Sequence, residues 1–118
     1  MNYSFKRTYS FKDRFKESSR IMNIYPDRLP IICERSENAP SDCPVIDKKK
    51  YLIPRDLTVG QFLYVIRNRL KLPAEKALFL FIKGTIPATS HYMDLIYDCY
   101  KDDDGFLYIT YTFENTFG

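Results

Sequence analysis

The longest uninterrupted apolar run in this chain is only six residues long, from Ala77 to Ile82. A membrane-spanning helix needs about 20 apolar residues, and no apolar segment near Met1 indicates a secretory signal. A run of this length predicts instead a β-strand that is buried on both faces or nearly so. With 118 residues, of which 16% are aromatic, we expect one domain whose core is assembled from several short elements.

A helix of about four turns is predicted after Ser10, which is a suitable N-cap, and it ends at Pro26. Residues 2–9 are compatible with a short additional helix. The residues that recur at helical spacing on one face are Phe11, Phe15, Ser18, Met22 and Tyr25, and an adjoining stripe holds Glu17, Ile21, Ile24 and Arg28.

Two further helices are predicted in the second half of the chain. Thr58 and Gln61 form a capping box that opens one of them, and this helix ends before Pro73. Ser90 is expected to cap the other, which runs from residue 91 to 100. The predicted inward side chains are Phe62, Val65, Ile66 and Arg69 on the first helix, and Met93, Ile96, Tyr97 and Tyr100 on the second.

Four strands are predicted, at residues 29–34, 51–53, 77–82 and 106–113. The second is short and lies between three lysines and Pro54, which is typical of a protected sheet edge. Turns are expected at residues 83–84 and 104–105, and residues 35–44 are predicted to form a loop. After the first helix the order is β-β-α-β-α-β, which predicts an α+β fold of the ubiquitin-like β-grasp type.

Several short strings stand in a recognisable order: Arg28–Glu34, Lys48–Pro54, Asp56–Phe62, Asp104–Tyr108 and Glu114–Gly118. On these strings the whole chain resembles the autophagy ubiquitin-like modifiers, the family of autophagy-related protein eight with its GABARAP and light-chain-three relatives. The resemblance implies two helices ahead of a ubiquitin-like core. We therefore expect a helical extension at 1–27, the core at 28–113 and a flexible conjugation tail at 114–118.

The resemblance also implies a function. In this family the C-terminal glycine, here Gly118, is joined to the amine of phosphatidylethanolamine, and Phe117 would help to place the tail in the conjugating enzymes. Gly118 is then either encoded as the last residue or exposed by a processing cysteine protease. The implied partners are activating and conjugating enzymes, that processing and delipidating protease, cargo receptors and a phosphatidylethanolamine membrane. The implied location is the cytoplasm, and the autophagosome membrane after lipidation.

Family resemblance further places a receptor-peptide groove beside the second strand, where an added peptide strand would bind. The expected ligand is an aromatic-x-x-aliphatic segment preceded by acidic residues. The alternative role for the apolar residues of this groove is plain core packing. One pocket would be lined by Glu17, Ile21, Pro30, Ile32, Lys50, Leu52 and Phe106, and the other by Tyr51, Ile53, Pro54, Leu57, Phe62 and Val65.

Basic residues around the groove would complement the acidic flank of that ligand: Arg28, Lys48, Lys49, Lys50 and Arg69. Exposed charges of this kind mainly steer and select partners. The lysine run can equally protect a sheet edge from unwanted pairing, and both roles are compatible.

No pattern in the sequence indicates catalysis. The lone histidine, His91, lies near a predicted helix start, and the cysteines at 33, 43 and 99 form no C-x-x-C pair. Their odd number and long spacing favour a reducing compartment. No glycine-rich phosphate loop is present. We therefore expect no enzyme activity, no cofactor and no metal.

Two other functions remain open at this point. One is a vesicle-traffic adaptor that uses the same groove without conjugation, which the absence of a phospholipid on the C-terminal peptide would reveal. The other is a basic RNA- or microtubule-binding module at residues 6–20, since residues 1–28 carry seven Lys or Arg against three Asp or Glu. That module would show a steep salt dependence. The net charge of only +3 is weak support for nucleic-acid binding, and we expect no nucleic-acid partner.

Overall fold

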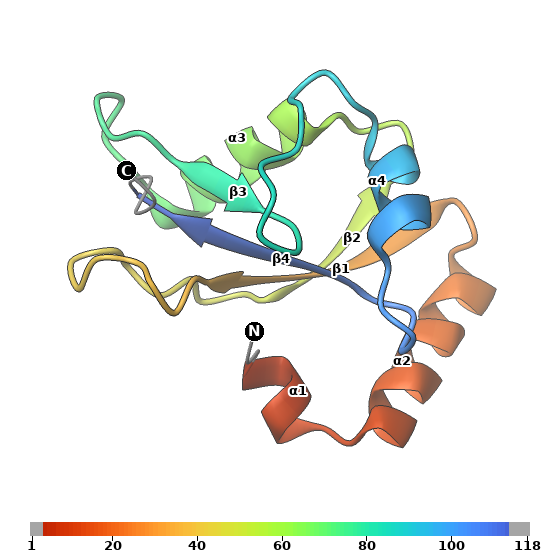
Figure 1. Cartoon of the computed structure of the whole chain (residues 1–118). Helices are drawn as coiled ribbons and strands as arrows, with labels where there is room; N and C mark the ends of the chain where they lie inside the picture. Colours follow the sequence, from red (N-terminus) through yellow and green to blue (C-terminus); the bar gives the residue numbers. More distant parts are fainter. Residues whose placement is uncertain (1–3, 114–118) are drawn as a thin grey trace.

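A four-stranded sheet runs through the molecule in the strand order β2-β1-β4-β3 (Figure 1). This computed structural model describes residues 4–113. The central pair, β1 and β4, is parallel, and the outer strands pair with it antiparallel. The strands are β1 (Arg28–Arg35), β2 (Lys50–Pro54), β3 (Phe79–Phe81) and β4 (Leu107–Thr112).

Helices lie on both sides of the sheet (Figure 1). They are α1 (Ser4–Thr8), α2 (Phe11–Ile24), α3 (Val59–Leu70) and α4 (Met93–Tyr100). In the described range the element order is α-α-β-β-α-β-α-β, which confirms the predicted succession and the short extra helix before residue 10. The division of the chain at residues 27 and 28 stays a prediction, and the predicted tail at 114–118 lies outside the described residues.

Helix α3 begins and ends as its sequence predicts. The Thr58 hydroxyl accepts from the backbone N–H of Gln61 at 3.1 Å, and the Gln61 side chain accepts from the N–H of Thr58 at 2.8 Å. Lys71 adopts the left-handed conformation that commonly ends a helix. The predicted inward face is right for Phe62 and Ile66, whereas Val65 and Arg69 are exposed.

The two predicted stripes of α2 are only partly buried. Phe11 and Phe15 are half exposed, and the buried residues are Arg14, Ser18 and Ile21. The reason is polar: Arg14 Nε donates to Asp104 at 2.8 Å, and the Ser18 hydroxyl donates to the Asp104 carbonyl. Ser10 caps the helix as predicted, accepting from the backbone N–H three residues on. Tyr25 and Ile24 are also exposed.

Helix α4 starts later than predicted and does not use Ser90 as its cap. Its N-cap is Tyr92, which makes no capping hydrogen bond through its side chain. The first amides are satisfied by backbone instead, since the N–H of Met93 donates to the Leu57 carbonyl at 2.7 Å. The predicted inward residues Met93, Ile96 and Tyr97 are buried, and Tyr100 is partly buried.

The long apolar run contributes the shortest strand, and β3 lies at an edge of the sheet. Four of its residues are buried as predicted, whereas Ala77 is exposed and Phe79 is half-buried. The chain then turns at Lys83 and Gly84, both with positive φ, where a turn was predicted. A second predicted turn ends at Gly105, whose φ is +88° and where a Cβ would collide with the Ser18 hydroxyl.

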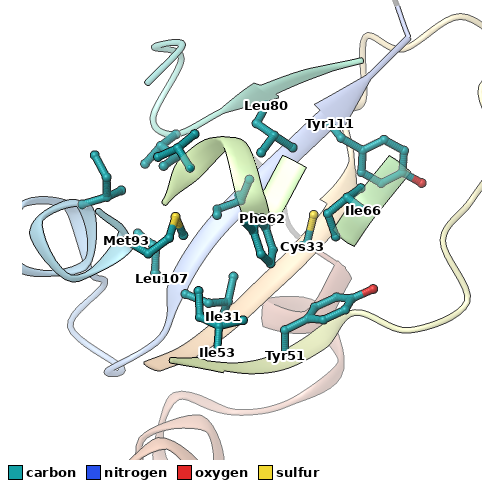
Figure 2. Packing of buried hydrophobic residues seen from close by; sticks show 14 of the residues in the cluster. Ile31, Cys33, Tyr51, Ile53, Phe62, Ile66, Leu80, Met93, Leu107 and Tyr111 are labelled. Atoms are coloured by element: carbon teal, nitrogen blue, oxygen red, sulfur yellow. The ribbon is translucent and has the colours of Figure 1, made fainter. Parts of the chain in front are cut away.

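Two apolar clusters lie on opposite sides of the sheet, as the alternation of strand side chains requires. In β1, Ile31 and Cys33 belong to the cluster under α3 and α4, and Ile32 belongs to the other. Figure 2 shows the first cluster gathered around Phe62 of α3. Among residues 4–113, the second cluster consists of Ile21, Ile32, Phe106 and Tyr108, with Phe5 packed against it.

Candidate functional site

The outer edge of β2 is the strand edge on which a partner segment could pair, because β2 forms one border of the sheet. Its side chains alternate: Lys50, Leu52 and Pro54 are exposed, and Tyr51 and Ile53 are buried. An incoming strand would therefore meet exposed backbone groups between two sets of side chains that point to opposite faces.

The first predicted set of groove residues gathers on the face toward α2. Across the strands, Leu52 lies opposite Pro30, and Lys50 lies opposite Ile32. Ile32 belongs to the smaller apolar cluster, together with Ile21 of α2 and Tyr108 of β4. In this set Ile21, Pro30, Ile32 and Phe106 are buried, Glu17 is partly buried, and Lys50 and Leu52 are exposed.

Glu17 forms the charged border of this face. Its carboxylate accepts from Arg20 at 2.7 Å and from Lys50 at 3.2 Å. The Arg20 guanidinium, with a smaller contribution from Lys50, holds the pKa of Glu17 below its ordinary value. Glu17 is therefore ionised at neutral pH and neutralises part of the lysine charge at the groove.

Helix α1 adds two aromatic residues to this site that the sequence analysis did not include. A cleft of about 370 Å³ between the N-terminal helices and β2 is lined by Phe5, Tyr9, Asp13, Arg14, Glu17 and Lys50. A neighbouring cleft of about 510 Å³ shares Phe5, Tyr9 and Lys50 and adds Thr8, Lys48 and Lys49. The signal that could have found them is the i, i+4 spacing of Phe5 and Tyr9, whose rings lie 5.0 Å apart.

Glu34 of β1 fastens α1 over the smaller apolar cluster. Its carboxylate accepts from the backbone N–H groups of Ser4 and Phe5 at 3.0 and 2.9 Å, and from the Ser4 hydroxyl at 2.8 Å. Lys49 lies 3.5 Å from the same carboxylate. The Phe5 ring packs edge-on against Phe106, with ring centroids 5.3 Å apart. Helix α1 therefore forms one wall of the clefts beside β2.

Most of the second predicted set lies toward α3, and three of its six residues are core. Tyr51, Ile53 and Phe62 are buried members of the main cluster, and Leu57 packs partly exposed against it. Pro54 and Val65 are exposed. The Tyr51 and Phe62 rings meet at right angles, 5.8 Å apart. A peptide side chain would first contact the exposed members of this set, and deeper insertion requires the buried ones to move.

The Tyr51 hydroxyl is buried without a hydrogen-bond partner in the part of the chain that the structure describes. Burial is the main cause that raises the pKa of Tyr51 to about 12. Lys48 lies over its ring, with Nζ 5.2 Å from the centroid.

The basic rim is unevenly neutralised. Lys50 is paired with Glu17, Lys49 with Glu34, and Arg69 with Asp47 at 2.8 Å. Across residues 4–113, no carboxylate lies within ion-pair distance of Lys48 or Arg28. These two cations are therefore the ones whose charge is available to an acidic partner without breaking an existing pair.

The chemistry of the cysteines gives no activated nucleophile near the groove. Burial raises the pKa of the Cys33 thiol, and it also raises the pKa of Cys43. Cys99 is exposed on α4. Among the described residues, no group of three His, Cys, Asp or Glu side chains is placed to hold a metal ion. The arrangement of edge strand, clefts and cations is suited to binding a peptide segment.

Strands β1 and β2 form an antiparallel pair, β1 and β4 are parallel, and α3 crosses one face of the sheet. This arrangement defines the class as a ubiquitin-like protein. The family model described as "Autophagy protein Atg8 ubiquitin like" matches residues 13–118. The chain belongs to this family of ubiquitin-like autophagy proteins.

Individual relatives support this membership over the full length. Autophagy-related protein 8c of Arabidopsis thaliana is 61% identical over 117 residues, which cover 99% of this chain and 97% of that protein. Autophagy-related protein 8 of Mycosarcoma maydis is 55% identical over 118 residues, covering 100% and 98%. The crystal structure of Trypanosoma brucei ATG8 superposes with a TM-score of 0.91 at 44% identity and covers all of both chains. The predicted family and fold class are thus confirmed.

Two predicted tail residues, Phe117 and Gly118, lie outside the described residues. No helix within residues 4–113 combines the length and apolar character that crossing a membrane requires.

Proposed function

We propose that this chain is a lipid-conjugated modifier of autophagy that docks cargo receptors through the edge of β2. The observation that supports docking most directly is the outer edge of β2, which lies at the border of the sheet between two apolar faces. Lys48 and Arg28 lie beside it, and no carboxylate of residues 4–113 is within ion-pair distance of either. A receptor segment would add its backbone to β2, place an aromatic side chain on the α2 face and place an aliphatic one near Val65. Its acidic flank would meet the two unpaired cations.

Conjugation through Gly118 is the second part of the proposal, and family membership supports it. The carboxylate would be adenylated, passed to a cysteine of the conjugating machinery as a thioester, and attacked by the amine of phosphatidylethanolamine, which expels the thiol. Glycine suits this step because its carbonyl can be approached closely in a narrow channel. Activating and conjugating enzymes would carry out the chemistry, and a cysteine protease would process and release the chain.

Two acyl chains would convert a chain without a membrane-spanning helix in its described part into a firmly anchored one, since two lipid chains suffice for stable anchoring. The protein would then exchange between the cytoplasm and the autophagosome membrane. In this proposal the chain binds and marks; it does not catalyse.

Substitution of Leu52 by alanine tests the groove. Leu52 is 36% exposed, so its truncation should leave the fold intact and weaken an aromatic-x-x-aliphatic peptide by about 1–2 kcal/mol. Calorimetric titration measures affinity, and a thermal melt measures stability. Ile86→Ala is the matched control, because Ile86 is 49% exposed and lies outside the groove. Equal affinities of the two variants would exclude the β2 edge as the docking site.

Deletion of Gly118 tests conjugation separately. The truncated chain should bind the same peptide as the full chain but fail to float with liposomes after incubation with cognate activating and conjugating enzymes and ATP. Mass spectrometry of the C-terminal peptide should show the added phospholipid only in the full chain. Equal flotation of both chains would refute conjugation at Gly118 and favour the unconjugated adaptor.

A further inference from the structure

A second concave surface lies at α4, with a lining that shares no residue with the clefts at α1 and β2. It is a cleft of about 430 Å³ between the segment that follows β2 and the outer face of α4. We call it the α4 cleft. Its lining residues are Arg55, Asp56, Tyr92, Asp94, Leu95 and Asp98.

The α4 cleft exposes apolar side chains at its surface. Tyr92 is 57% exposed and Leu95 is 50% exposed. They are three residues apart at the start of a helix, so they share one face. Single exposed apolar residues are ordinary, but a large aromatic and a leucine side by side within a concavity offer an anchor site for an apolar side chain of a partner.

The charge around the α4 cleft is acidic. Asp94 is paired with Arg55 at 2.7 Å, whereas Asp56 and Asp98 have no ion-pair partner among residues 4–113. Three carboxylates against one guanidinium leave the lining with a net charge of −2. Asp94 and Asp98 are one helical turn apart, so the negative charge follows the length of α4. This sign is opposite to that of the lysine rim at β2.

The walls of the α4 cleft are fixed to each other by backbone hydrogen bonds. The N–H of Met93 donates to the Leu57 carbonyl at 2.7 Å, and the N–H of Asp94 donates to the Arg55 carbonyl at 3.2 Å. Arg55 Nε also donates to the Pro26 carbonyl at 3.0 Å. Three segments of the chain therefore hold this surface in place before any partner arrives, which reduces the ordering cost of binding.

We propose that the α4 cleft binds a short segment of another protein that carries an aliphatic side chain flanked by lysine or arginine. The aliphatic group would lie between Tyr92 and Leu95, and the cations would approach Asp56 and Asp98. The acidic lining disfavours nucleic acid and anionic lipid. Because the cleft has its own lining and the opposite charge, it would accept a basic segment while β2 holds an acidic one. The inference does not depend on lipid conjugation.

The test uses the full chain and two synthetic hexapeptides with blocked ends. The probe has the sequence Lys-Leu-Lys-Arg-Leu-Arg, and its charge-reversed counterpart has glutamate at each basic position. Titration of ¹⁵N-labelled protein should give probe shifts concentrated at residues 55–56 and 92–98, with a dissociation constant of about 0.1–1 mM. The counterpart should leave these residues unshifted. A saturating acidic-flanked receptor peptide should not compete with the probe.

Two variants and one control assign the effect to the α4 cleft. Leu95→Ala should weaken the probe about 5-fold by removing the apolar anchor. Asp98→Lys should weaken it about 10-fold by reversing the local charge. Asp103→Lys makes the same change in net charge at an exposed site outside the cleft, and it should weaken the probe less than about 2-fold at physiological salt. Thermal melts should show that all three variants remain folded.

Several outcomes would overturn the proposal. Equal weakening by Asp98→Lys and Asp103→Lys would show attraction by overall charge alone. Shifts spread over the whole surface, or no shift at about 2 mM probe, would show that the cleft has no affinity for such a segment. Concentration-dependent self-association that Asp98→Lys abolishes would assign the surface to a second copy of the chain instead. None of these results bears on binding at Leu52 or conjugation at Gly118, so failure here is distinguishable from failure of the proposed function.

Discussion

The two sides of the sheet hold their helices by different physical means. Under α3 and α4 lies a broad cluster of buried apolar side chains (Figure 2). Under α1 and α2, four buried apolar residues of the described range meet, and charged and polar groups complete the contact. Apolar packing is non-directional and distributed over many residues, whereas ion pairs and hydrogen bonds depend on single groups. The helices on the N-terminal side therefore depend on a few individual polar groups, whereas those on the other side depend on the size and fit of buried apolar side chains.

A buried network at Asp104 is the centre of the polar side. Its carboxylate is fully buried and accepts from Arg14 Nε at 2.8 Å and from the Tyr108 hydroxyl. Arg14 also donates to the carbonyls of Lys6 and Tyr9. Burial, followed by the hydrogen bond to Asp104, raises the pKa of Tyr108, so its hydroxyl stays protonated as a donor. One guanidinium thus joins α1, α2 and the turn before β4.

The largest expected effect is on the apolar side. Phe62→Ala removes a fully buried ring from the middle of the main cluster and should lower the free energy of unfolding by about 3–5 kcal/mol. Tyr64→Ala is the control on the same helix, because Tyr64 is 62% exposed. Urea denaturation followed by circular dichroism measures both. A loss below about 1 kcal/mol for Phe62→Ala would contradict an apolar origin of stability on this side.

Arg14→Met tests the polar side with a nearly matched volume. It leaves the Asp104 carboxylate buried without its cationic partner and should lower the free energy of unfolding by about 3 kcal/mol. Arg20→Met is the control on the same helix, since Arg20 is exposed and pairs with Glu17. The control should change stability by less than about 1 kcal/mol. Similar losses in the two variants would contradict the role given to burial.

Glu34→Gln should have a smaller and local effect. It removes the charge that caps the first amides of α1 and pairs with Lys49, and the expected loss is about 1–2 kcal/mol. Amide hydrogen exchange at residues 5–8 should accelerate, while exchange in α3 should not. Glu37→Gln is the control, because Glu37 is exposed in the following loop. Unchanged exchange in α1 would show that the charge of Glu34 does not hold this helix in place.

The smallest expected effect is a pH dependence confined to α1. Burial acts to raise the pKa of Asp102, but hydrogen bonds from Lys6 and from the backbone N–H of Asp104 outweigh it and hold the pKa below 3.8. The stability from the Lys6–Asp102 pair is therefore present above the unfolded-state pKa and is lost as the pH falls through the lower folded-state value. The contribution of this partly exposed pair should be below about 1 kcal/mol.

Chemical shifts of residues 5–8 between pH 5 and pH 2 measure this effect. The wild-type chain should show a titration step below about pH 4, and Lys6→Met should shift this step to higher pH because burial then acts on the Asp102 carboxyl without its cationic partner. A step that persists unchanged in Lys6→Met would assign the titration to another carboxylate.

Local signals allowed the sequence to predict the order of elements and the β2 edge. The capping box at Thr58, the turn at Gly105 and the lysines beside β2 each depend on residues that are close in the sequence, so the sequence alone predicts them. The inward face of α2 was not predictable in this way. It depends on Arg14 meeting Asp104, which lies 90 residues away. An arginine in an amphipathic helix is ordinarily assigned to the solvent face.

The candidate site shows the same limit. The groove residues predicted from the sequence include members of β1, β2 and α3 but not Phe5 or Tyr9, because α1 is brought to the clefts by contacts with distant residues such as Glu34. The predicted start of α4 was wrong for a similar reason. The N–H of Met93 at the beginning of the helix is satisfied by the backbone carbonyl of Leu57 and not by the side chain of Ser90. Contacts between segments that are distant in the sequence determine these features, so the spacing of residues along the chain does not predict them.

The place of β4 in the sheet has a mechanical consequence. This strand lies between β1 and β3, and the proposed conjugation tail continues directly from it. With Gly118 anchored in a membrane and a receptor pulling on β2, tension would act along the axis of β4. The parallel register from Ile31–Leu107 to Arg35–Tyr111 would then be loaded in shear, so that its hydrogen bonds resist together and do not open one after another. A tether built on this strand would carry load without unravelling the domain that displays the docking surfaces.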